Sequence, residues 1–114
     1  MASYATVQDV IDRYGNEQLL LLADRANDGV VDSAAVDTAL SDASAEMDAY
    51  LAVRYSLPLS SPPALLVRLC VDIAMYRLSV SSWPPEERRR RFDDALLLLT
   101  RLSKGEAGFG SGSM

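Results

Sequence analysis

The segment from residue 64 to 78, "ALLVRLCVDIAMYRL", constrains the fold more than any other part of the chain. As a helix it is apolar on nearly every side, and its only charged residues are Arg68, Asp72 and Arg77. A helix without a polar face must be covered by other elements. The run is also shorter than the ~20 residues that cross a bilayer. The sequence therefore predicts a buried central helix inside a bundle and no membrane association.

Prolines separate this helix from its neighbours. "SLPLSSPP" precedes it and "WPP" follows it. Proline has no backbone N–H to donate and restricts the residue before it, so neither stretch continues a helix. Pro62 or Pro63 suits the first turn of the central helix.

Two short helices are expected within the first 24 residues. Thr6 and Asp9 form a weak capping-box pattern at the start of "VQDVIDRY", and Gly15 ends that helix. "NEQLLLLAD" predicts a second short helix, capped by Asn16.

Two longer helices complete the pattern. Between Ser33 and Arg54, apolar residues recur at steps of three and four while acids fill the intervening positions, which predicts an amphipathic helix with an acidic outer face. A last helix is expected from Glu86 to Ser103, with an inward stripe of Phe92, Ala95, Leu96, Leu99 and Leu102. Leu97 and Leu98 widen that stripe beyond one contact face.

The predicted fold class is therefore all-α. The expected architecture is one domain of about five helices over residues 1–104, followed by a flexible Gly/Ser-rich tail at 105–114. We expect the most buried side chains to include Leu66, Leu69, Ile73 and Leu96.

The stretch "DRANDGVVD" resembles part of a calcium-binding loop. Asp24, Asp28 and Asp32 fit loop positions 1, 5 and 9, and Gly29 fits position 6. Ala26 and Ala35 occupy positions 3 and 12, so the bidentate carboxylate is missing. These aspartates are therefore only weak metal candidates, and we interpret the stretch as a turn in which Asp32 caps the following helix.

Little else in the chain points to catalysis. The sequence has no His, which excludes Ser-His and Cys-His nucleophiles and His-ligated metals. Cys70 lies in the most apolar helix and is expected to be a buried, inert thiol. Asp72 is expected to form an ion pair with Arg68 or Arg54. We expect neither an enzyme nor a cofactor.

Charge divides the chain into unlike halves. Residues 1–60 contain ten acids and three bases, a net of −7, whereas residues 61–114 contain six acids and eight bases, a net of +2. An acidic protein is repelled by nucleic acid, so no specific nucleic-acid binding is expected. Unlike halves suit contacts between neighbouring subunits, because complementary charge sets their orientation.

Several blocks resemble a known family in order and spacing. They are "YATVQDVIDRYG", "DRANDGVVD", "ALSDASAEMDAYLAVRYSLPL" and "LCVDIAMYRL" with a Pro-Glu-rich start to the last helix. From about Tyr4 to Lys104 the chain is similar to the small head-to-tail joining proteins of Mu-like bacteriophages and prophages. Family members often carry an acid and a glycine where this chain has Ala26 and Asn27, which further weakens the metal interpretation.

The resemblance implies a structural connector that docks beneath the portal as a homo-oligomeric ring. Its partners would be other copies of itself and phage portal or tail proteins. It would be located in the virion, and in the host cytoplasm during assembly. A small calcium-binding or protein-interaction helical module of a prophage is the alternative.

A ring subunit needs two different faces that match. We expect acids of the third helix to oppose arginines of the last helix, with the surplus leucines at a subunit or portal interface. The candidate interface residues are Asp42, Glu46, Asp48, Arg88, Arg89, Arg90, Arg91, Leu97 and Leu98.

Overall fold

The computed structural model describes residues 3–23, 29–55, 57, 63–79 and 86–106. In these ranges every regular element is a helix, which confirms the all-α prediction. The five helices are α1 (Val7–Tyr14), α2 (Asn16–Ala23), α3 (Ser33–Leu51), α4 (Ala64–Leu78) and α5 (Glu86–Ser103).

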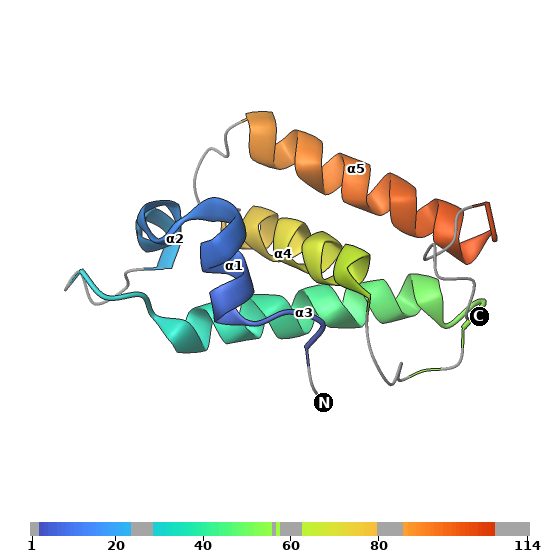
Figure 1. Cartoon of the computed structure of the whole chain (residues 1–114), viewed down its shortest axis with the longest axis horizontal. Coiled ribbons are helices and arrows are strands. Elements are labelled where there is room, and N and C mark those ends of the chain that lie inside the picture. Colours follow the sequence, from blue (N-terminus) through green and yellow to red (C-terminus); the bar gives the residue numbers. More distant parts are fainter. Residues whose placement is uncertain (1–2, 24–28, 56, 58–62, 80–85, 107–114) are drawn as a thin grey trace.

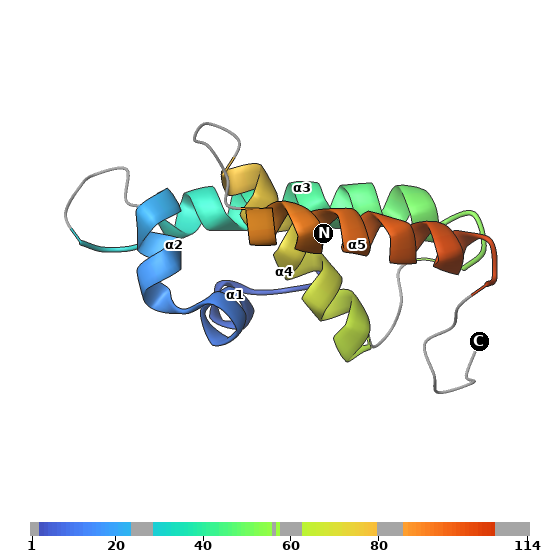
Figure 2. The ribbon, with the colours of Figure 1, turned by 90° about the horizontal axis from the view of Figure 1, so that it is seen from above.

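Helices α3, α4 and α5 form the body of the molecule. Figure 1 shows α4 between α3 and α5, and α4 packs against both. The chain runs in the same direction along α3 and α5 and in the opposite direction along α4 (Figures 1 and 2). Helix α1 packs on α4 and α3, and α2 contacts α1 and α3. The central helix is therefore covered from three sides, as its composition requires.

The first two helices begin and end close to the expected residues. Thr6 and Asp9 form the capping box, in which the Asp9 amide donates to the Thr6 hydroxyl and the Thr6 amide donates to the Asp9 carboxylate. Gly15 ends α1 with φ of 90°, a backbone angle that favours glycine. Asn16 is the first residue of α2, so it does not occupy the cap position that was predicted for it. That position is one residue earlier.

Helix α3 is shorter than its sequence pattern indicates. Asp32 caps it as predicted, accepting a hydrogen bond from the Ala35 amide, but the helix ends at Leu51 and not at Arg54. The amides of Arg54 and Tyr55 both donate to the Leu51 carbonyl, which closes a turn. That turn buries the Tyr55 ring, and this burial outweighs continuation of the helix.

The core has the expected centre, with one correction. Leu66 and Ile73 are fully buried and Leu69 nearly so. Leu96 is only partly buried, so its inclusion among the most buried residues was wrong. The buried positions of α5 are 92, 95, 99 and 102, whose spacing of three, four and three follows one helix face. Leu96 is not one of these positions and lies at the edge of that face.

Candidate interaction surface

Asp72 is a nearly buried carboxylate held by two residues of α1. The Arg13 guanidinium donates to both of its oxygens, with Nε to Oδ1 at 2.7 Å and Nη2 to Oδ2 at 3.0 Å. The Tyr14 hydroxyl donates to Oδ1 at 2.8 Å. The Asp72 side chain is 5% exposed and that of Arg13 is 30% exposed. A charge in so apolar a helix is tolerated because it is paired and hydrogen-bonded.

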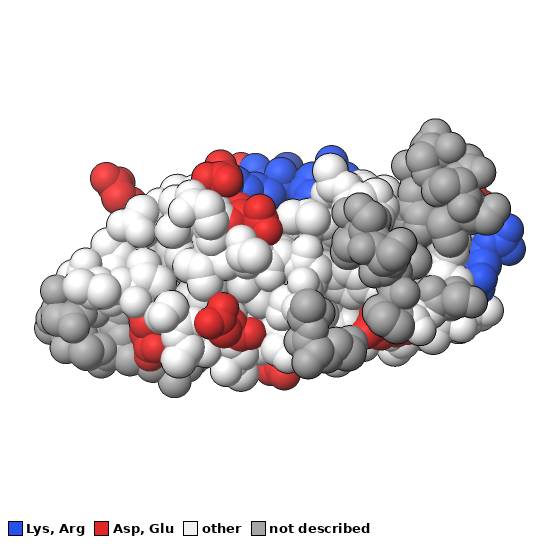
Figure 3. Space-filling view, turned by 60° about the horizontal axis from the view of Figure 1, so that its bottom comes forward, with Lys and Arg blue, Asp and Glu red and all other residues white. Residues whose placement is uncertain are grey.

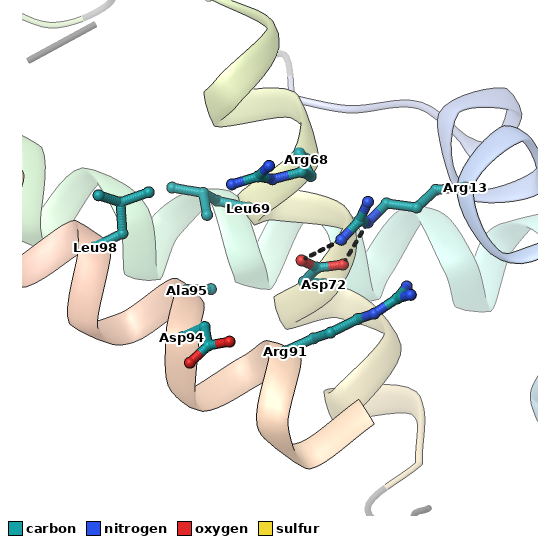
Figure 4. Close-up of a pocket in the computed structure, with 8 residues that line it drawn as sticks. All are labelled: Arg13, Arg68, Leu69, Asp72, Arg91, Asp94, Ala95 and Leu98. Atoms are coloured by element: carbon teal, nitrogen blue, oxygen red, sulfur yellow. Dashed lines mark hydrogen bonds and ion pairs between the residues drawn. The ribbon is translucent and has the colours of Figure 1, made fainter. Parts of the chain in front are cut away.

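The expected ion pair of Asp72 was therefore assigned to the wrong arginines. Arg68 lies one turn earlier on α4, but its side chain extends toward Leu69 in Figure 4, and the bonds of Asp72 drawn there go to Arg13. Arg54 lies against Gly105, where an added Cβ would sit 2.7 Å from the guanidinium carbon. No sequence pattern links Asp72 to Arg13, because the two are 59 positions apart and meet only through helix packing.

Tyr14 links this cluster to α5. The guanidinium carbon of Arg91 lies 5.0 Å from the centre of the Tyr14 ring, within the range of a cation–π contact. Burial raises the pKa of the Tyr14 hydroxyl to about 12, and the neighbouring Asp72 carboxylate adds to this rise while Arg91 opposes it.

A pocket of about 280 Å³ opens beside the cluster, between α1, α4 and α5 (Figure 4). Three arginines, two aspartates and three apolar side chains line it: Arg13, Arg68, Arg91, Asp72, Asp94, Leu69, Ala95 and Leu98. The sequence predicted a functional role for only Arg91 and Leu98 of this group. Arg13 and Arg68 carried no signal of their own, since each is a single charge at the edge of an apolar stripe.

The acids of α3 fall into two groups. Glu46 accepts two hydrogen bonds from Arg77 of α4, at 2.9 and 2.7 Å, and Asp48 accepts one from the Tyr4 hydroxyl. Asp42 is exposed and has no hydrogen bond or ion pair within the described residues. Of the three predicted interface acids, Asp42 is therefore the one whose carboxylate is open to another molecule.

Figure 3 views the molecule with the α3 side turned forward. Carboxylates are scattered over this face, whereas Lys and Arg appear at its upper edge and right-hand end. The sequence of α3 contains no Lys or Arg at all. The predicted acidic outer face is thus a surface feature of the folded molecule.

The four arginines at the start of α5 do not act alike. Arg89 and Arg90 are exposed. Arg88 donates to the Ser79 hydroxyl at 2.6 Å. Nη2 of Arg91 lies 3.7 Å from Oε1 of Glu87 on the same helix. Two of the predicted interface arginines therefore have contacts inside the subunit, and the other two project from it.

The two surplus leucines also differ. Leu97 is 53% exposed, whereas Leu98 is partly buried, packs against the core and lines the pocket. Leu97 is thus a solvent-exposed apolar side chain, as are Leu21, Val30 and Val53 among the described residues.

Of the remaining candidate site residues, those that the structure describes have structural roles. Asp32 is the cap of α3, while Asp24 and Asp28 lie outside the described residues. Among the described residues, no group of three or more Cys, Asp or Glu side chains is placed to hold a metal ion. Cys70 is buried, its Sγ lies 3.5 Å from the Ser44 hydroxyl, and burial raises the pKa of its thiol.

The fold and surface describe a small helical protein with an acidic face on α3 and an arginine-lined pocket between α1, α4 and α5. Within the described residues, no helix has the length and apolar character of a membrane span.

Comparison with known proteins gives the family. Residues 4–113 match the family model described as Bacteriophage Mu, Gp36. Gene product J of Escherichia phage Mu is 38% identical over 109 residues, which cover 95% of this chain and 77% of that protein. The Mu-like prophage FluMu protein gp36 of Haemophilus influenzae is 34% identical over 110 residues, with 96% and 77% coverage. The chain belongs to the Bacteriophage Mu Gp36 family and is a Mu-like phage protein.

Proposed function

We propose that this protein is a head-completion subunit of the virion, a connector that docks below the portal as a ring and joins the filled head to the tail. The observation that carries the proposal is family membership, since the match to the phage Mu family extends over residues 4–113. Its relatives belong to phage Mu and to a Mu-like prophage. A structural role in assembly, without catalysis or a cofactor, is the function proposed.

The distribution of charge supports a ring. A ring is built from heterologous contacts, in which one face of a subunit meets a different face of the next. The acidic face of α3 and the exposed Arg89 and Arg90 at the start of α5 supply charges of opposite sign on two parts of the surface. Exposed Leu97 supplies apolar area on α5.

The polar groups of the interior support a structural role. Asp72 is fixed by Arg13 and Tyr14, so its carboxylate holds α1 against α4. The thiol of Cys70 is buried and its pKa is raised, which opposes nucleophilic chemistry at neutral pH.

Disruption of the gene in a Mu-like phage tests the proposed function. Electron microscopy of the lysate is expected to show DNA-filled heads and separate tails, and expression of the protein from a plasmid should restore joined particles. Joined, infectious particles in the mutant lysate would contradict the connector role, and so would an arrest before the heads are filled.

A further inference from the structure

We propose that the arginine-lined pocket between α1, α4 and α5 binds a carboxylate on the α3 face of a neighbouring copy of this chain, and that Asp42 supplies it. The inference rests on the ring proposed above and names the contact that would close it. It adds a receptor site lined by arginines of three helices, of which Arg68 is the one without a hydrogen bond or ion pair among the described residues.

The charges of the pocket favour an anion. Its lining contains three arginines and two aspartates, a net charge of +1. Asp72 and Arg13 neutralise each other through their two bonds, and Arg91 lies beside Glu87 and the Tyr14 ring, which leaves Arg68 as the open cation. Asp94 is exposed and lies on the α5 side of the pocket, whereas Arg68 lies on the α4 side (Figure 4). Arg68 is exposed and has no hydrogen bond or ion pair in the described part of the chain, so its guanidinium is open to a ligand.

The pocket has room for a side chain of another molecule. A volume of about 280 Å³ lies just below the roughly 300–1,000 Å³ of small-molecule pockets. Leu69, Ala95 and Leu98 give the pocket an apolar wall next to the cations. Apolar surface beside a charge lowers the local dielectric and strengthens a charge-assisted hydrogen bond formed there.

The α3 face of a second copy has the complementary chemistry. Asp42 is exposed and makes no hydrogen bond or ion pair within the described residues, α3 contains no base, and the Asp42 charge acts on Arg77 of α4. Ala45 and Ala49, three and seven positions further on, are also exposed and lie on the same side of the helix. Their small side chains let another subunit approach the α3 backbone closely. Asp37, also exposed, lies on a different side of α3.

Cysteine pairs test the contact without removing its charges. Ala45→Cys lies one turn after Asp42, and Ala64→Cys lies one turn before Arg68; both alanines are exposed, and the native Cys70 is buried. With oxidised glutathione, a mixture of the two variants is expected to form a disulfide-linked dimer that neither variant forms alone. Ala34→Cys, exposed near the start of α3, replaces Ala45→Cys as the matched control.

Charge reversal then identifies the residues. Arg68→Glu or Asp42→Arg in the cysteine background should each slow the 45–64 disulfide at least about tenfold, as expected for a partly buried charge pair at an interface. Combining Arg68→Glu on one copy with Asp42→Arg on the other should restore the rate. Arg101→Glu and Asp37→Arg serve as charge-matched controls at exposed positions outside the contact.

The proposal is overturned if the 45–64 disulfide forms no faster than the 34–64 disulfide, or if the two reversals fail to compensate. It is also overturned if no 45–64 disulfide forms in either the purified protein or assembled particles. Particles that join heads to tails normally yet lack this cross-link would refute the pocket contact and leave the connector role standing.

Discussion

Arg13 and Asp72 join the first helix to the central one through a two-pronged ion pair between residues 59 positions apart. Tyr14 adds a third bond to the same carboxylate. The pair satisfies the one acid of α4 and at the same time forms one side of the arginine-lined pocket. Stability and the proposed contact surface therefore share a residue cluster.

Removing the carboxylate is expected to be costly. Asp72→Ala leaves the Arg13 guanidinium and the Tyr14 hydroxyl without their shared acceptor, and we expect a loss of about 3 kcal/mol in the free energy of unfolding. Asp94→Ala, an exposed acid of the same pocket, should change stability by less than about 0.5 kcal/mol. Urea unfolding of the two variants measures both values. Similar stabilities would show that the pair does not anchor α1.

Ionisation of Tyr14 is expected to lower the stability of the fold at alkaline pH. Its pKa is raised from the ordinary value of 10.0 to about 12 in the folded protein, so the folded state holds the proton more tightly than the unfolded state. This contribution is fully present below pH 10 and is lost as the pH rises from about 10 to 12. Denaturant unfolding across that range should show a smaller decline for Tyr14→Phe. An identical decline in the variant would assign the loss to other groups.

The cap of α3 gives a test of the Asp-rich stretch. Asp32→Ala removes the hydrogen bond to the Ala35 amide and should lower the free energy of unfolding by about 1 kcal/mol, with or without added calcium. Ser33→Ala, at the exposed first position of α3, is the control and should have little effect. A cost that appears only when calcium is present would revive a metal role for this stretch.

The core is tested at Leu69, which is 2% exposed on α4. Leu69→Ala should cost roughly 2–5 kcal/mol, a large share of a small domain's stability. Leu21→Ala, at a position that is 81% exposed, removes the same atoms from the surface. Thermal unfolding of both variants should separate them by many degrees, and equal melting temperatures would contradict the placement of α4.

Much of the fold followed from local patterns. The apolar spacing, the capping box at Thr6 and the glycine at position 15 are short-range signals, and the structure agrees with each. The predicted end of α3 and the predicted burial of Leu96 were wrong, because both depend on tertiary packing. Tyr55 is drawn into the core by a turn, and the buried stripe of α5 passes beside Leu96.

The candidate site was less predictable for the same reason. Glu46 and Asp48 looked available in the sequence, yet in the fold they bond to Arg77 and Tyr4, which lie far away along the chain. Arg13 and Arg68 acquire their place in the pocket only when α1 and α5 pack on α4. A charge pattern predicts a face, whereas the partner of each charge is decided by tertiary structure.

The exposed residues of α5 allow the effect of charge on association to be tested separately from the effect of apolar contact. Reversing Arg89 and Arg90 to Glu should slow subunit association most at low salt. At physiological ionic strength, screening limits the reach of an exposed charge to about 8 Å, so the reversal has less effect there. Leu97→Asp should abolish association at every salt concentration, since apolar burial is not screened. Light-scattering kinetics of the two folded variants at low and high salt gives both results. Normal assembly of Leu97→Asp would place the interface elsewhere.

The connector role is tested most directly by adding the purified protein to an extract of phage-infected cells in which its gene is disrupted, and measuring the titre of infectious particles. On the proposed role, such an extract contains filled heads and free tails and lacks only this protein. We predict that the titre rises steeply with added protein and that the Leu97→Asp variant gives no rise. A titre that stays at background with folded wild-type protein, while plasmid expression during infection restores it, would contradict a role in head completion.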